Sequence, residues 1–241
     1  MKIAVISDIH GNAVAFRQVL ENMKSTGVSA VYCLGDNIGY GPEPLEVIRL
    51  LEKNKIPSVI GNHELAVNEP EFLDWFNPIA RISLEKTMEF LSRQALDYIA
   101  GLPFYITEHG CRFVHGFPPD SATEYLFEIS YQRLLKTLDH PSERICFVGH
   151  THELLLVSRN GDDIAKRPMK KETITLDTDT DYIINVGSVG QPRDGNNCAK
   201  YVIFDDQSFE LEVRFVPYDV NETISKIFYA GLPEQHAWRL M

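Results

Sequence analysis

Five short apolar segments of the sequence are each followed directly by residues that can bind a metal ion. These residues are aspartate, asparagine and histidine, and glycines adjoin them, in the fragments Asp8-Ile9-His10-Gly11-Asn12, Gly35-Asp36-Asn37, Gly61-Asn62-His63-Glu64, His115-Gly116 and Gly149-His150-Thr151-His152. Ligands of α/β proteins gather beyond the carboxyl ends of the strands, so the five fragments can converge on one site. The glycines allow the sharp turns that such a convergence needs.

The donor atoms in these fragments are carboxylate or amide oxygen and imidazole nitrogen, without any thiolate. This set suits Mn²⁺, Fe or Zn²⁺ at a reactive site better than a closed structural zinc site. Seven such donors are too many for one tetrahedral ion and suit two ions with open positions. A shared carboxylate could bridge ions about 3.5–4 Å apart, which is the spacing of two-metal hydrolytic sites.

Each fragment has a plainer explanation when it is taken alone. Asp36 after a glycine could make an Asx-turn, Asn62 could be a turn residue, and a His-x-His pair can follow a strand by chance. All five fragments in this order, each at the end of a strand, are hard to attribute to turns. Together they predict a metal centre.

The segments that must position these residues alternate between strand and helix patterns in the first half of the chain. Strands are expected at 3–7, 30–34, 57–60, 112–114 and 144–148, and helices at 12–25, 44–54 and 124–137. This alternation is typical of an α/β fold. After His152 the chain is β-rich, with strands expected at 154–158, 172–176, 182–186, 200–205 and 209–217, a hairpin turn at Asn160-Gly161 between two of these strands, and a final helix at 221–229.

Residues 65–100 interrupt the alternation with apolar residues at helical spacing. We expect a helical insertion there, beginning one helix near Pro78, whose ring suits a first helical turn. The insertion either packs against the core or forms one wall of a substrate cleft. Because neither a repeat nor a low-complexity linker is present, residues 1–241 are expected to form a single domain.

The composition excludes several classes of function. The 241 residues are 44% hydrophobic and 24% charged, as in ordinary globular proteins. The net charge of −11 argues against a broad nucleic-acid surface, which would depend on Lys and Arg. Without an apolar run of roughly 20 residues or a signal peptide, the protein is expected to be cytoplasmic and not membrane-bound. The four cysteines form no C-x-x-C pair, and Cys33 and Cys146, which lie in strand-like segments, are expected to be buried, reduced thiols.

In combination, the five fragments resemble the signature blocks of the calcineurin-like metallophosphoesterases over residues 3–152. The segment Asn185-Val186-Gly187-Ser188-Val189-Gly190-Gln191-Pro192-Arg193 resembles a late motif of their bacterial and archaeal small-phosphoesterase branch. The resemblance implies a two-sheet β-sandwich core flanked by helices, with the helical insertion at about 65–100. It also implies metal-dependent hydrolysis of phosphate esters.

The resemblance further implies a role for each residue of the site. Asp8, His10 and His152 would hold one divalent ion, Asn62, His115 and His150 a second, and Asp36 would bridge both. Mn²⁺ is favoured over Fe, Zn²⁺ or Ni²⁺. A metal-bridging hydroxide would attack phosphorus while His63, as general acid, protonates the leaving oxygen. Asn12 could donate to a phosphoryl oxygen or cap a helix, and Arg193 could hold phosphate or face solvent.

One departure from the family pattern bears on the substrate. Phosphoprotein phosphatases of the superfamily carry an arginine shortly after the Gly-Asp block, whereas residues 36–42 here contain none. A diester carries less charge than a monoester dianion, so we expect a phosphodiesterase acting on a small molecule or nucleotide. The alternatives are a phosphomonoesterase or protein phosphatase, a diadenosine-polyphosphatase-like hydrolase, an exonuclease and a non-catalytic scaffold. The presence of His63 argues against the scaffold. The oligomeric state is left open.

Three further histidines match none of the blocks. His109, His140 and His236 are expected to be exposed residues of loops or the tail.

Overall fold

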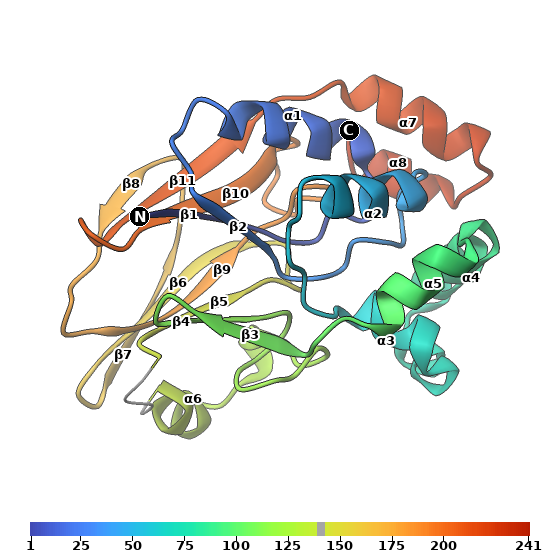
Figure 1. Ribbon diagram of the computed structural model, residues 1–241. Coiled ribbons are helices and arrows are strands. Elements are labelled where there is room, and N and C mark those ends of the chain that lie inside the picture. Colours follow the sequence, from blue (N-terminus) through green and yellow to red (C-terminus); the bar gives the residue numbers. More distant parts are fainter. Residues whose placement is uncertain (139–142) are drawn as a thin grey trace.

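The computed structural model describes residues 1–138 and 143–241, in which two β-sheets lie face to face with helices outside them (Figure 1). The five-stranded sheet has the order β2 (Ala30–Cys33), β1 (Lys2–Ile6), β10 (Ala199–Asp205), β11 (Glu210–Val216) and β8 (Thr173–Thr175). The six-stranded sheet has the order β3 (Tyr105–Glu108), β4 (Cys111–Val114), β5 (Ile145–Val148), β9 (Asp181–Val186), β6 (Leu154–Asn160) and β7 (Asp163–Pro168). The predicted two-sheet α/β fold is confirmed.

Strand β1 shows why the strands of this protein are continuous apolar runs. It lies between β2 and β10, and both of its faces are buried. Ile3 and Val5 point into the space between the sheets, whereas Ala4 and Ile6 pack against helices α1 (Ala13–Met23) and α2 (Pro44–Lys53). Because side chains alternate across a strand, burial of both faces requires apolar residues at successive positions.

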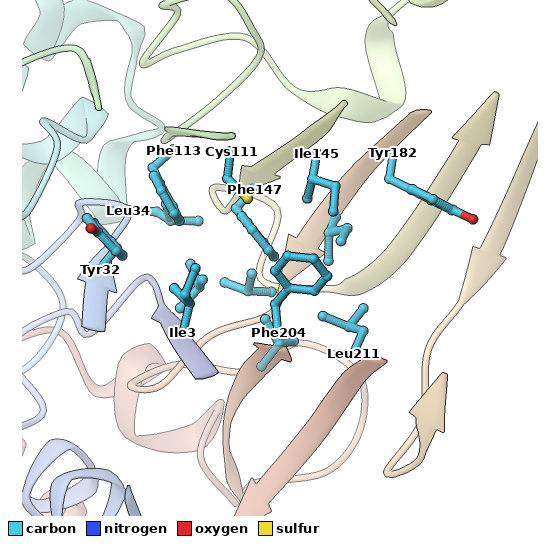
Figure 2. Close-up of a cluster of buried hydrophobic side chains, with 14 of the residues drawn as sticks. Ile3, Tyr32, Leu34, Cys111, Phe113, Ile145, Phe147, Tyr182, Phe204 and Leu211 are labelled. Carbon is cyan, nitrogen blue, oxygen red and sulfur yellow. The ribbon is translucent and has the colours of Figure 1, made fainter. Parts of the chain in front are cut away.

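The main core fills the space between the two sheets. Figure 2 shows Ile3 and Phe204 from one sheet meeting Phe113 and Phe147 from the other. The Phe113 ring stacks on Tyr32, with ring centroids 4.1 Å apart. On the outer face of the six-stranded sheet, α6 (Tyr131–Leu138) covers a second apolar cluster. The sheets are thereby held at a fixed distance from each other, which fixes the relative position of the strand ends.

The expected helical insertion is confirmed, although it has more elements than a helical pair. It consists of α3 (Asn62–Asn68), the 3-10 helix η1 (Pro70–Trp75), α4 (Pro78–Phe90) and α5 (Arg93–Ala100), which lie together at one end of the sheets (Figure 1). Pro78 is the first residue of α4, and the Asn77 side chain accepts a hydrogen bond from the amide of Ala80 at 3.0 Å. Helix α3 begins at one of the predicted donors, so the insertion grows directly out of the site.

The end of the chain also differs from the expectation. The final helix is present as α7 (Val220–Tyr229), and it is followed by a short helix, α8 (Glu234–Trp238), that the apolar pattern did not indicate. A further 3-10 turn, η2 (Leu126–Glu128), precedes α6. Helices α7 and α8 pack on each other through an apolar cluster of their own.

One strand prediction and one strand pairing were wrong. Residues 57–60 make only an isolated bridge, between Ser58 and Cys33, because Pro57 has no N–H and the amide of Ile60 donates to the carbonyl of Pro103 at 2.8 Å instead. The hairpin at Asn160-Gly161 joins β6 to β7, and the strand expected at 172–176 belongs to the other sheet as β8. Strand β7 was missed because it is an exposed edge strand without an apolar face.

Across the two described ranges, no helix is both long and apolar enough to cross a membrane.

Candidate metal centre

The sheet topology brings the five predicted fragments to one edge of the sandwich. Strands β1 and β2 are parallel, as are β4 and β5, so their carboxyl ends point the same way. Backbone hydrogen bonds tie the fragments together: the His10 amide donates to the Asp36 carbonyl at 2.9 Å, and the Gly149 amide to the His115 carbonyl at 2.8 Å. The amide of His150 donates to Oδ2 of Asp8 at 3.1 Å, which links the two sheets.

Most of the seven predicted donors have a strained backbone. Asp8, His10, Asp36, His150 and His152 have φ values between 48° and 68°. Non-glycine residues are uncommon in this left-handed region, and such conformations cost on the order of 1–3 kcal/mol each. Strain of this kind clusters where side chains must be aimed at a common point, which fits a ligand-binding centre.

Asp8, His10 and His152 form one buried group. The Nε2 atoms of His10 and His152 are 3.0 Å apart, and Oδ1 of Asp8 is 3.3 Å from Nε2 of His152 and 3.8 Å from Nε2 of His10. Oδ1 of Asp8 has no hydrogen-bond partner among residues 1–138 and 143–241. A buried carboxylate oxygen without a partner is costly, and a cation between these three side chains would satisfy it.

Asp36, Asn62, His115 and His150 form the second group. Nε2 of His115 is 3.1 Å from Nδ1 of His150, 3.2 Å from Oδ1 of Asn62 and 3.3 Å from Oδ2 of Asp36. The same Oδ2 atom of Asp36 is 3.7 Å from Nε2 of His10 in the first group. Asp36 therefore lies between the two groups, in a position to serve both.

The other ring nitrogen of each of these histidines contacts a backbone carbonyl. The distances are 3.0 Å from His10 Nδ1 to Ile38, 2.6 Å from His152 Nδ1 to Gln191, 2.7 Å from His115 Nδ1 to Leu34 and 3.2 Å from His150 Nε2 to Thr123. A carbonyl only accepts, so each of these nitrogens carries the proton. In the neutral rings the remaining nitrogens carry lone pairs that face each other: Nε2 of His10 and Nε2 of His152 are 3.0 Å apart, and Nε2 of His115 and Nδ1 of His150 are 3.1 Å apart. Opposed lone pairs repel unless a cation or a proton lies between them.

The electrostatics of the second group lead to the same conclusion. Burial lowers the pKa of His150 to about 3. Although burial opposes it, the carboxylate of Asp36 raises the pKa of His115 to about 9. The carboxylates of the site thus attract a positive charge strongly enough to hold a proton on one imidazole when nothing else supplies it. Metal ions at these positions would supply that charge. The residues present therefore fit two divalent cations.

His63 lies beside these two groups, but its ring packs against aromatic side chains. Its amide donates to Oδ1 of Asp36 at 3.0 Å, and its ring packs edge-on against Tyr40 and Phe76, with centroids at 4.6 and 4.9 Å. Nδ1 of His63 finds no hydrogen-bond partner in the described part of the chain. Burial lowers its pKa to about 4, against the opposing effect of Asp36. A Cβ at Gly39 would lie 2.1 Å from this Nδ1, so only glycine fits beneath the ring.

Glu64 holds two of the fragments in register, a role that the sequence did not reveal. Its carboxylate accepts hydrogen bonds from the amides of Asp36, Asn37, Ile38 and Gly61 at 2.9, 2.7, 3.2 and 3.0 Å. The side chain is fully buried. Glutamate at the third position of a helix is a capping signal, and this signal could have indicated the bond to Gly61. The three bonds to residues 36–38 depend on the tertiary fold.

The two tentative substrate contacts have different environments. Asn12 is buried, its Oδ1 accepts from the amide of Ala15 at 3.1 Å, and its Nδ2 donates to the Gly190 carbonyl at 3.0 Å. These bonds favour the capping role that the sequence left open. Arg193 is exposed, with Nη2 3.5 Å from Oε1 of Gln191. Nη1 of Arg239, which the sequence did not single out, is 3.4 Å from the same oxygen.

The expectation for the three unassigned histidines was wrong for one of them. His236 is 3% exposed and stacks at a tilt over Tyr40, with ring centroids 4.6 Å apart. Its burial comes from α8, the helix that the apolar pattern did not indicate. His109 is exposed, and His140 lies outside the described residues.

A cleft opens beside the second group and includes the helical insertion in its wall. Asn62 and His150 line it together with Phe72, Trp75 and Phe76 of the insertion. Of the two roles expected for residues 65–100, the wall of a substrate cleft is therefore favoured over packing alone.

Comparison with known proteins agrees with this geometry. Residues 1–208 match the calcineurin-like phosphoesterase superfamily domain. An uncharacterized protein of Methanocaldococcus jannaschii is 38% identical over 99% of this chain and 96% of its own length. The crystal structure of a metallophosphoesterase from Sphaerobacter thermophilus is 35% identical with a TM-score of 0.85, covering 100% of this chain and 98% of that one. A hypothetical protein from Pyrococcus horikoshii, 20% identical, shares the fold with a TM-score of 0.80 over 99% and 97%. The chain belongs to the calcineurin-like phosphoesterase superfamily.

Proposed function

We propose that this protein is a two-metal phosphodiesterase that hydrolyses a small phosphodiester or a nucleotide. The observation that carries the proposal is the pair of opposed imidazole contacts, His10 with His152 and His115 with His150, whose other nitrogens contact carbonyls. Asp8, His10 and His152 would hold one ion, Asn62, His115 and His150 the other, and Asp36 would bridge them. Two bound divalent cations lower the pKa of a water molecule and neutralise phosphate charge. Mn²⁺ is our favoured metal.

His63 is the proposed general acid. Its ring is kept in place by Gly39 beneath it and by the Tyr40 and Phe76 rings at its edges. Burial keeps the imidazole neutral in the free protein, and the negative charge of a bound phosphate ester raises the pKa towards the protonated form. The proton then passes from the ring to the departing oxygen, a contribution typically worth about 10²–10⁴-fold.

The preference for diesters rests on the scarcity of positive side chains near the centre. Among the described residues, neither lysine nor arginine lines the cleft beside Asn62 and His150. The two nearby guanidinium groups, Arg193 and Arg239, are exposed and share one acceptor on Gln191. A diester monoanion needs less positive charge than a monoester dianion, so this environment favours the diester. A phosphomonoesterase is the alternative that the two arginines would support.

The test begins with metal content, which does not depend on turnover. After chelation and reloading with Mn²⁺, elemental analysis is expected to give two ions per chain for the wild type and for His63→Ala, and fewer for Asp36→Ala. One ion or none in the wild type would refute the two-metal proposal. The initial rates on bis-p-nitrophenyl phosphate and p-nitrophenyl phosphate then decide between diesterase and monoesterase.

The role of His63 has a separate readout. p-Nitrophenolate leaves without much help from a proton, whereas an alkoxide needs one. The His63→Ala variant is therefore expected to lose more activity on an alkyl phosphodiester than on bis-p-nitrophenyl phosphate. Equal losses on both substrates would mean that His63 acts on the structure of the site and not as an acid.

A further inference from the structure

The cleft beside the metal centre is lined mainly by aromatic rings. Its volume is about 280 Å³, and five of its lining residues are Tyr40, Phe72, Trp75, Phe76 and Tyr125, a set that we call the aromatic cleft. The cleft also includes Asn62 and His150, two of the proposed metal ligands. A group bonded to a phosphate at the metal centre can therefore extend directly into it.

One wall of the aromatic cleft contains an aromatic side chain, Trp75, that contributes little to the hydrophobic core. Trp75 is 71% exposed, whereas Leu73 in the same short helix, η1, is buried in the apolar cluster of the insertion. In a 3-10 helix, residues three apart lie on one face. Phe72 and Trp75 therefore lie on one face, with ring centroids 4.9 Å apart. A large exposed ring that adds little to the core is a common feature of a binding surface.

The other parts of the cleft touch the reacting groups. The Tyr125 ring stacks on His150, with centroids 3.9 Å apart and an interplanar angle of 20°. The Phe76 ring meets the His63 ring edge-on at 4.9 Å. The aromatic cleft thus extends from a proposed metal ligand to the proposed general acid, the two groups between which an ester bond would be broken.

The character of the cleft excludes a charged occupant. Asp, Glu, Lys and Arg are all missing from its lining within the described residues, where the polar groups are two amides, the hydroxyls of Thr123, Tyr40 and Tyr125, and the His150 ring. Oδ1 of Asn77 is used by the α4 cap, which leaves the amide nitrogen of that side chain as a donor at the edge. Flat apolar walls with a few hydrogen-bonding edges suit a neutral, planar ring system.

We propose that the aromatic cleft binds the organic group of the substrate, and that this group is a planar aromatic ring system of the nucleobase class. The inference rests on the proposed function in one respect, namely that the phosphate lies at the metal centre. The volume of about 280 Å³ is near the lower end of the roughly 300–1,000 Å³ of small-molecule sites. It accommodates one small ring system and not a folded protein segment.

The test compares two ligands that differ only by a base. AMP and ribose 5-phosphate carry the same sugar and phosphate, and their affinities for the Mn²⁺-loaded protein are measured by calorimetry and by inhibition of bis-p-nitrophenyl phosphate hydrolysis. Stacking of a base on aromatic side chains is typically worth enough for AMP to bind about tenfold more tightly than ribose 5-phosphate. Trp75→Ala and Phe72→Leu are expected to reduce this ratio to below about threefold while ribose 5-phosphate binds as before. Tyr229→Ala removes a ring that is 96% exposed elsewhere and is expected to keep the full ratio.

Equal affinities of AMP and ribose 5-phosphate for the wild type would overturn the inference. A tenfold ratio that survives both cleft substitutions would also overturn it, because the base would then bind elsewhere. The failure of the proposed function looks different: the affinity ratio and its loss in the variants persist, but no ester is hydrolysed. Since Trp75 is largely exposed, its replacement leaves the fold intact, and an unchanged affinity for ribose 5-phosphate verifies this in the same experiment.

Discussion

Replacing Glu64 by glutamine should destabilise the protein far more than an ordinary change of a carboxylate to an amide. Oε1 of Glu64 accepts from the amides of Asn37 and Ile38, and Oε2 accepts from those of Asp36 and Gly61. Glutamine offers one oxygen and one NH₂ group, so in either orientation two buried N–H groups face a donor. Each unsatisfied buried group costs about 1–3 kcal/mol, which predicts a loss of about 2–6 kcal/mol in the free energy of unfolding.

The assay is urea denaturation of the metal-free protein, because bound metal would stabilise the folded state and hide part of the loss. Total stabilities are usually about 5–15 kcal/mol, so the variant should still fold at low temperature with a clearly lower midpoint. Glu21→Gln serves as the matched control, since Glu21 is exposed on α1 and pairs with Lys24, and its change should be below about 1 kcal/mol. A loss below about 1 kcal/mol for Glu64→Gln would refute the reasoning, since the four amides would then be satisfied without the carboxylate.

Three other changes can be predicted from the contacts described. Gly39→Ala should lower the free energy of unfolding by about 2–4 kcal/mol and reduce turnover severely, because the φ of Gly39 is +80° and the new methyl group would overlap the His63 ring. Full activity of this variant would contradict the prediction, since it would show that the His63 ring can move aside at no cost. Arg239→Ala should raise KM for an anionic ester about fivefold with kcat unchanged, an effect of about 1 kcal/mol at an exposed site, whereas Arg93→Ala on α5 should leave KM unaltered. Glu46→Gln should reduce the free energy of unfolding by up to about 1 kcal/mol at neutral pH, because hydrogen bonds from Arg49 lower the pKa of Glu46 to about 2. Since this folded-state pKa lies below the usual 4.5, the stability difference between wild type and variant should shrink as the pH falls from about 4.5 towards 2. Urea titrations at several pH values measure this difference, and a constant difference would contradict the pairing of Glu46 with Arg49.

The sequence was sufficient to predict that the candidate donors meet at one place, because they lie in short fragments that follow apolar segments. Asp8, Asp36, His115 and His150 are local in this sense, and parallel strand ends need only a common sheet edge to meet. The third fragment also lies beside the others, although its expected strand is a single bridge. Gly61 is the N-cap of α3 and Asn62 is its first residue, so the chain turns at Gly61-Asn62 even without a preceding strand.

What the sequence could not show depends on contacts between distant segments. The three bonds of Glu64 to residues 36–38 arise only when α3 packs beside the end of β2. Arg239 and His236 reach the site because α7 and α8 fold back over it, and neither helix carries a motif that specifies this path. The sequence offered residues 65–100 as one wall of a cleft, but it could not show the opposite wall, because Tyr125 belongs to a separate segment that meets Trp75 only in the folded protein.

The place of β1 in its sheet has a consequence for how the protein is made. β1 is synthesised long before β10, one of its two neighbours in the sheet, whose residues 202–205 pair with residues 2–5. The amides of Val189 and Gly190 donate to the carbonyls of Ser7 and Asp8, and the Gln191 carbonyl orients His152. Once His152 has been synthesised, every proposed metal ligand is present, but β10 and the Gln191 carbonyl that contacts His152 are still missing. Contacts this distant in sequence make folding slow, so we expect the site to gain its full set of backbone contacts only after β10 has been synthesised.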